Sequence, residues 1–119
     1  MIRLAEAQPA AVYMYRCDGA SPAMGGKLGA AHGIELPFVW NALDLPFSTL
    51  LLGEVASLRP FAAAIHATWC AFIKSGTPAD GGLPAWPRYD RARRATMLLD
   101  LESHVADDPD GTLRELWRA

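Results

Sequence analysis

Large apolar residues at helical spacing mark one long helix in the second half of the chain. Between residues 60 and 75 they recur every three or four positions, a period typical of a helix with one buried face. These residues are Phe61, Ile65, Trp69, Phe72 and Ile73. Ser57 is a plausible N-cap, and Gly76 supplies the stop. The opposite face is mostly alanine, which predicts that a second surface approaches the helix closely there.

Short runs of β-branched, aromatic and aliphatic residues predict three strands, over residues 11–16, 95–101 and 103–106. The first has apolar residues on both faces, as in a strand buried inside a sheet. The other two are expected to pair with each other across a short turn. A helical turn is expected over residues 2–8. Thr112 and Glu115 have the spacing of a capping box for a last helix that ends near Trp117.

Two further segments carry apolar residues without a regular period. In residues 34–53 the apolar positions follow no single spacing, and Pro37 excludes a long regular helix. We expect a loop or short turns that need a partner surface. Residues 81–90 are rich in proline and predict an extended connector, with Trp86 and Tyr89 as anchors.

The composition indicates a folded chain rather than a disordered one. The chain has 119 residues, of which 51% are hydrophobic and 20% charged, and this length corresponds to one domain or a piece of one. The net charge is −2 and no basic stripe is present, so we expect no nucleic-acid partner. The N-terminus has no apolar run of signal-peptide length, and residues 47–53 are too few to span a bilayer. We therefore expect a soluble, cytoplasmic protein without a membrane partner.

The two cysteines, Cys17 and Cys70, do not form a C-x-x-C pair. His66 and Cys70 have the one spacing that could place two metal ligands on one helix face. A zinc site needs more donors nearby, and the sequence offers none, so we expect no metal. Both thiols are interpreted as structural.

His32 is the candidate for proton chemistry. It lies between small residues in a glycine-rich stretch, and Glu35 follows three positions later. An imidazole can transfer protons near neutral pH. The residues around His32 also fit a structural histidine in a turn. The same stretch fits no phosphate-binding motif, because Lys27 is followed by Leu28 and the glycine spacing is not G-x-G-x-x-G.

Five segments in unbroken order resemble the C-terminal part of a type B carboxylesterase, in the α/β-hydrolase family that also contains the cholinesterases. They are VYMYR at 12–16, GAAHGIELPFVW at 29–40, HATWCAFIKSGTP at 66–78, LPAWPRYD at 83–90 and ATMLLD at 95–100. The second is similar to the family segment G-x-x-H-G-x-E-L-P-[YF]-V-[FW]. The resemblance implies an α/β fold in which residues 1–119 form the C-terminal portion of an α/β-hydrolase. That portion would contain few strands, one long helix, a C-terminal helix and an incomplete sheet.

The resemblance also implies a role for His32 as the general base of a Ser-Glu-His triad that hydrolyses carboxylic esters. Gly33 would leave room for substrate and serine, and Glu35 would support the histidine from behind rather than act as the triad acid. The family's chemistry implies no cofactor. The nucleophile motif G-x-S-x-G occurs nowhere in the sequence, and the oxyanion loop and the segment with the triad acid are also missing. We therefore expect no esterase turnover by these 119 residues alone.

Three functional hypotheses remain open at this point. In the first, the chain works when joined to, or complemented by, an N-terminal esterase portion, and a small ester is its substrate only then. In the second, it is a non-catalytic module that oligomerises or binds a partner through the exposed edge of strand 11–16 and the apolar stretch 34–53. In the third, it is a truncated relic without a separate function.

Overall fold

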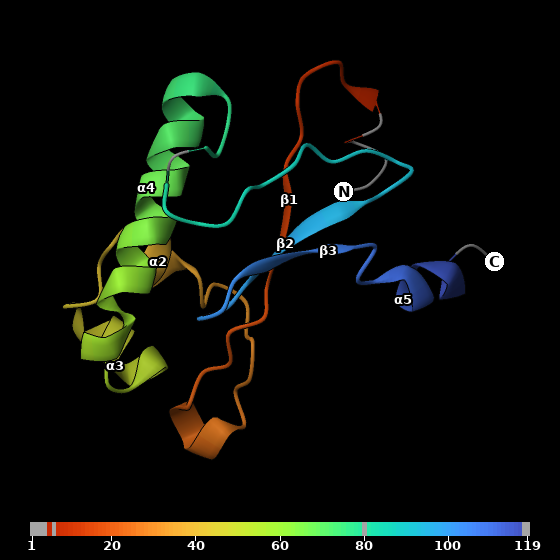
Figure 1. The fold of residues 1–119 in the computed structure, drawn as a ribbon. Helices are drawn as coiled ribbons and strands as arrows, with labels where there is room; N and C mark the ends of the chain where they lie inside the picture. Colours follow the sequence, from red (N-terminus) through yellow and green to blue (C-terminus); the bar gives the residue numbers. More distant parts are fainter. Residues whose placement is uncertain (1–4, 6, 80, 118–119) are drawn as a thin grey trace.

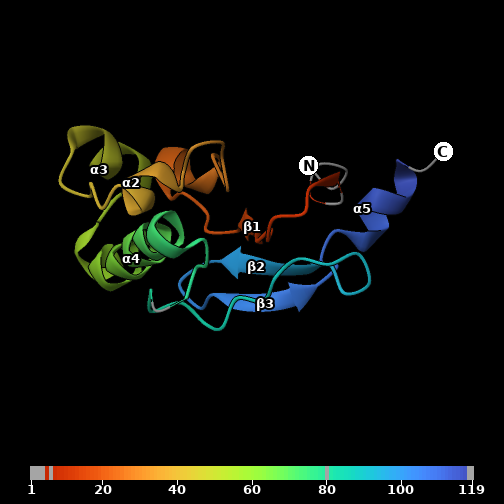
Figure 2. The ribbon, with the colours of Figure 1, turned by 90° about the horizontal axis from the view of Figure 1, so that it is seen from above.

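The computed structural model describes residues 5, 7–79 and 81–117 and shows a small sheet flanked by helices (Figure 1). The elements in chain order are β1 (Met14–Cys17), the 3-10 helix η1 (Ala23–Gly26), α2 (Leu36–Val39), α3 (Pro46–Leu52), the 3-10 helix η2 (Ala56–Leu58), α4 (Arg59–Ser75), β2 (Ala95–Leu99), β3 (His104–Asp107) and α5 (Gly111–Leu116). Seen from above, α2, α3 and α4 gather at one end of the sheet and α5 lies at the other (Figure 2). The expected α/β class is confirmed. The helical turn expected over residues 2–8 falls largely outside the described residues.

The three strands are ordered β1-β2-β3, so β2 is central and β1 is at one edge. β1 runs parallel to β2 with Tyr15 opposite Met97, and β3 runs antiparallel to β2 with His104 opposite Leu98. The pairing of the last two strands is confirmed. The first strand begins at Met14 rather than at residue 11, and among the described residues it has a neighbour on one side only. The expectation that it lies inside a sheet is therefore wrong for this part of the chain.

The outer edge of β1 is defined by its hydrogen-bond pattern. The N–H of Asp18 donates to the carbonyl of Leu99 at 2.9 Å, which places the backbone groups of the even-numbered residues on the β2 side. Because successive residues of a strand point their N–H and C=O groups to opposite edges, those of Tyr15 and Cys17 face outward. No strand in the described part of the chain pairs with this edge.

The long helix α4 confirms the prediction from periodicity almost to the residue. It spans 17 residues and ends at Gly76, whose φ of 75° is the left-handed C-cap conformation, and the Gly76 N–H donates to the Phe72 carbonyl at 2.8 Å. The N-cap is Leu58 rather than Ser57, because the 3-10 turn η2 runs directly into the helix and incorporates Ser57. Leu58 makes no side-chain cap bond in the described structure.

The core lies between α4, the short helices and β2. Its buried members are Ile34, Phe38, Leu43, Leu52, Ala62, Ile65, Met97 and Leu99. All five residues of β2 are buried, as expected for a strand with a neighbour on each side. On the buried side of α4, Gly81 approaches so closely that a Cβ there would lie 1.9 Å from the hydroxyl oxygen of Thr68, and only glycine fits. On the alanine face, Ala63 and Ala67 are exposed, so the close approach expected there is not found at these positions.

Two helix predictions need correction. Residues 46–52 form the helix α3 instead of a loop, with Pro46 in its first turn. Its buried face includes Ser48, whose hydroxyl donates to the Ala42 carbonyl at 2.6 Å, so a polar residue at a core position hides the apolar period. In α5 the N-cap is Asp110, which makes no side-chain cap bond, and Thr112 lies inside the helix. The predicted capping box is therefore wrong.

Within the described residues no single helix is long and apolar enough to cross a membrane. The pair Pro46–Leu52 and Ala56–Ser75 meets the length and composition requirements together, but it is bent by 93°.

Candidate active site

The chain leaves β1 at Cys17, makes an excursion through η1 and returns to the strand at His32. The excursion is closed by Ser21, whose N–H donates to the Gly29 carbonyl at 2.9 Å. The Ser21 hydroxyl donates to the Leu51 carbonyl in α3, and the side chain is 1% exposed. Because both ends of the excursion are fastened, the residues that follow Gly29 are held beside the outer edge of β1.

His32, Gly33 and Glu35 line one hollow with β1. Its volume is about 320 Å³, and its wall consists of residues 13–17 on one side and residues 30–33 with Glu35 on the other. The structure thus brings together the three site residues predicted from sequence, along the unpaired edge of the strand. Gly33 has a φ of 80°, which favours glycine, while a Cβ there would make only ordinary contact with Leu36 at 3.5 Å. The backbone conformation, rather than lack of space, accounts for glycine at this position.

The imidazole of His32 is exposed. Among the described residues no hydrogen bond to either of its ring nitrogens is present, and Glu35 does not contact it through one. A base needs a proton donor within hydrogen-bond reach and usually an orienting partner. Within residues 5, 7–79 and 81–117, His32 has neither.

Glu35 acts electrostatically on the strand across the hollow. Burial raises the pKa of the Tyr15 phenol, and the negative charge of Glu35 raises it further. Burial also raises the pKa of the Cys17 thiol, and Glu35 is again among the carboxylates that add to this effect. Glu35 is half-buried at the start of α2 and makes no cap bond there. Its carboxylate therefore contributes negative charge at the outer edge of β1.

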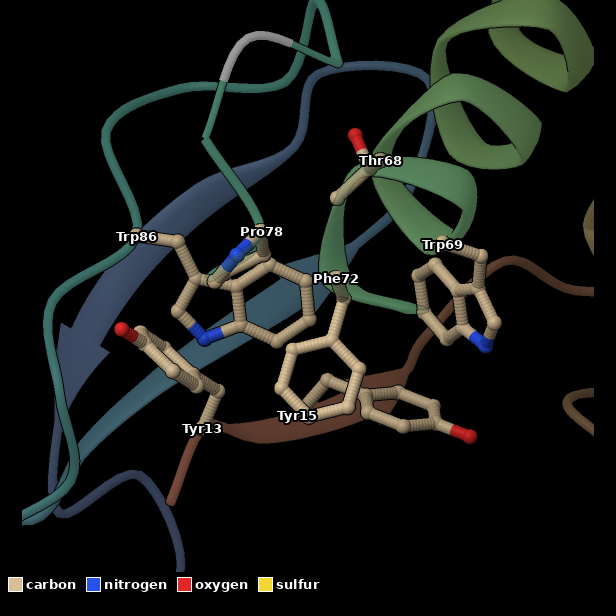
Figure 3. A pocket seen from close by; sticks show the side chains of 7 residues that line it. All are labelled: Tyr13, Tyr15, Thr68, Trp69, Phe72, Pro78 and Trp86. Atoms are coloured by element: carbon tan, nitrogen blue, oxygen red, sulfur yellow. The ribbon is translucent and has the colours of Figure 1, made fainter. Parts of the chain in front are cut away.

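An aromatic cluster that the sequence interpretation did not assemble lies on the α4 side of the sheet (Figure 3). Figure 3 shows the rings of Tyr13, Tyr15, Trp69, Phe72 and Trp86, which with Thr68 and Pro78 line a pocket of about 120 Å³. Tyr15 and Trp69 pack edge to face with centroids 5.2 Å apart, and the Trp86 indole N–H donates to the Met14 carbonyl at 3.1 Å. The cluster fastens β1 to α4 and to the proline-rich connector. Tyr13 and Tyr15 line both this pocket and the His32 hollow.

The described part of the chain contains no group of three or more His, Cys, Asp and Glu side chains that could hold a metal ion. His66 and Cys70 do contact each other, at 3.6 Å between Nε2 and Sγ. The shared helix face predicted from their spacing is confirmed.

The chain is similar in sequence and in structure to known esterases. No family model matches the sequence. It is 31% identical to the para-nitrobenzyl esterase of Bacillus subtilis over 112 residues, which cover 93% of this chain and 22% of that protein. It is 34% identical over 102 residues to the phenmedipham hydrolase of Pseudarthrobacter oxydans, covering 82% of this chain and 20% of the relative. The crystal structure of a Geobacillus stearothermophilus carboxylesterase superimposes with a TM-score of 0.82 at 38% identity, covering 99% of this chain and 25% of that one.

The chain belongs to the type B carboxylesterases. The family predicted from the motif order is thereby confirmed, and so is the partial α/β-hydrolase fold. The chain spans about a fifth of the length of the curated relatives it matches.

Proposed function

We propose that residues 1–119 form the C-terminal segment of a carboxylesterase site and that His32 is its general base. The observation that supports this proposal is the hollow along the free edge of β1, where an exposed imidazole and an outward-facing strand edge lie together. A second polypeptide segment would contribute the nucleophilic serine, the acid and the oxyanion hole.

The chemistry assigned to His32 is a proton relay. Its imidazole accepts the proton of the serine hydroxyl as the serine oxygen attacks the ester carbonyl. It then donates that proton to the departing alkoxide, which leaves as the alcohol and gives an acyl-serine. In the second half, it takes a proton from water and returns it to the serine as the acid is released. Glu35, which lines the same hollow, would support the histidine from behind rather than act as the triad acid.

A chimera tests the proposal. The segment of the Geobacillus stearothermophilus carboxylesterase that this chain matches is replaced by residues 1–119, and hydrolysis of p-nitrophenyl esters is measured. The chimera should hydrolyse the ester, and His32→Gln should abolish the activity. The matched control is His104→Gln, because His104 is also exposed and lies in β3, away from the hollow. A cooperatively folded chimera that retains its activity with His32→Gln would contradict the assignment.

A second candidate function is non-catalytic association. Apolar side chains of the stretch 34–53 divide into a buried set and an exposed set. The exposed set is Leu36, Trp40, Leu45, Phe47 and Leu50, with Leu50 at 76% and Trp40 at 71%. Together with the free edge of β1, such a surface favours self-association. Light scattering at increasing concentration tests this, and a monomer throughout would argue against it.

A further inference from the structure

A thiol and an imidazole contact each other on α4, away from the His32 hollow. His66 and Cys70 are four residues apart, so their side chains lie on the same helix face one turn from each other. The Cys70 Sγ is 3.6 Å from the His66 Nε2, and both residues are half-buried. Neither residue lines the hollow that contains His32.

The second ring nitrogen of His66 fixes which form of the imidazole faces the thiol. Its Nδ1 lies 2.8 Å from the Val39 carbonyl at the end of α2. A carbonyl oxygen can only accept a hydrogen bond, so Nδ1 carries the hydrogen. In the neutral ring the lone pair is then on Nε2, directed at Sγ. A nucleophile, a base and a third group that orients the base are the parts of an activated cysteine.

Cys17 provides a contrast within the same chain. Cys17 lines the same hollow as His32, but among the described residues no imidazole hydrogen-bonds to its thiol. Burial raises the pKa of that thiol, and the charges of Glu35, Asp18 and Asp100 add to the effect. Those carboxylates oppose ionisation of the Cys17 thiol, whereas at Cys70 an imidazole contacts the sulfur.

We propose that His66 and Cys70 form a thiol–imidazole pair that makes Cys70 a site of exchange with low-molecular-weight disulfides. The proton on Sγ passes to Nε2 of His66, and the sulfur attacks one sulfur of the small disulfide. A new S–S bond forms to Cys70 as the S–S bond of the reagent breaks. The imidazolium gives its proton to the departing thiolate or, where that thiolate is too weak a base to accept it, to water. Cys70 is oxidised to a mixed disulfide, and half of the reagent is reduced to a thiol.

The test measures both cysteines with dithiobis(nitrobenzoate), an aromatic disulfide that releases a coloured thiolate on exchange. Cys17→Ala and Cys70→Ala variants of the full chain isolate the two reactions at neutral pH. Cys70 should react at least about tenfold faster than Cys17. His66→Gln should slow Cys70 by about tenfold, because glutamine can still donate to the Val39 carbonyl but is not a base.

The reaction of Cys17 serves as the folding control, since an unfolded His66→Gln chain would expose that thiol and accelerate it. The two rates in chains that keep His66 decide the question even if the glutamine variant disturbs the fold. Equal rates, or a faster Cys17, would overturn the proposal. So would a folded His66→Gln chain whose Cys70 rate stays within about twofold of the parent. Incubation with oxidised glutathione followed by peptide mass analysis should place the mixed disulfide on Cys70.

Discussion

The α4 side of β1 and its outer edge differ in how many of their polar groups have partners. On the α4 side, Trp86 donates to the strand backbone and Tyr15 packs against Trp69. His66, on the helix that covers this side, has its Nδ1 on a carbonyl and its Nε2 beside a thiol. At the outer edge, backbone groups of the strand face a hollow, and His32 stands exposed beside them.

Both ring nitrogens of His66 therefore have partners, whereas those of His32 have none among the described residues. His66 connects α4 to α2, so replacing it should lower the free energy of unfolding. The His32 ring makes no hydrogen bond in the described part of the chain, so replacing it should lower catalysis in an assembled esterase and leave the stability of the chain unchanged. Substitutions at these two positions should therefore have opposite signatures in stability and in catalysis.

The largest expected effect is catalytic. In the carboxylesterase chimera, His32→Gln should lower kcat/KM by about 10³- to 10⁴-fold, because the serine loses its proton acceptor. The free energy of unfolding should change by less than about 0.5 kcal/mol, since the side chain is exposed. Ester hydrolysis and thermal unfolding of the same preparation provide both numbers. If His32→Gln lowered activity and stability together, His32 would be a structural residue, and the contrast with His66 would fail.

The largest effect on stability is expected at Gly81, which packs against α4. Gly81→Ala would bring a Cβ within 1.9 Å of the Thr68 hydroxyl and 2.3 Å of its Cα, so backbone must move. We expect a loss of about 3 kcal/mol in the free energy of unfolding, measured by urea denaturation. Gly19→Ala is the matched control, because its Cβ would meet only the Asp100 carboxylate at 3.8 Å. Equal effects at the two glycines would show that the connector is not held against α4.

His66→Ala should destabilise the chain by about 1–2 kcal/mol, because the Val39 carbonyl loses its donor and the helix pair loses a contact. The control is His104→Ala, since His104 is exposed and its Nδ1 lies 3.1 Å from the Glu102 carbonyl, two residues away in the chain. Urea denaturation of the two variants measures the difference. If His104→Ala costs as much, His66 does not fasten α4 to α2.

The smallest effect is expected at Trp86. Trp86→Phe keeps an aromatic ring in the cluster but removes the donor to the Met14 carbonyl. The expected loss is about 1 kcal/mol in the free energy of unfolding, the usual contribution of one such hydrogen bond. Trp69→Phe is a useful comparison because no hydrogen bond to its indole N–H is present in the described residues. A Trp86 variant as stable as the parent would show that the rings alone hold β1.

The sequence carries enough information for the elements whose signals are local. The apolar stripe of α4, its Gly76 stop and the β2–β3 pairing depend on residues close together in the chain. The helix α3 was missed because Ser48 occupies a buried position and is satisfied by the Ala42 carbonyl, a bond that no pattern of apolar residues reveals.

The sequence named the members of the candidate site but not the groups that surround them. The motif order singled out His32, Gly33 and Glu35, and the structure places them around one hollow. Whether β1 is an edge strand depends on which segments pair with it. The residues of the strand itself do not reveal its pairing partners. The Val39 carbonyl that orients His66 comes from a different helix, so helical spacing could predict the His66–Cys70 face but not the oriented base.

The most direct test of the account is the esterase activity of the 119-residue chain by itself. If the outer edge of β1 holds a general base without its nucleophile, the purified chain should hydrolyse p-nitrophenyl acetate no faster than its His32→Gln variant. Clear turnover by the purified chain that disappears in His32→Gln would contradict the account, because it would mean that these residues already contain a working nucleophile.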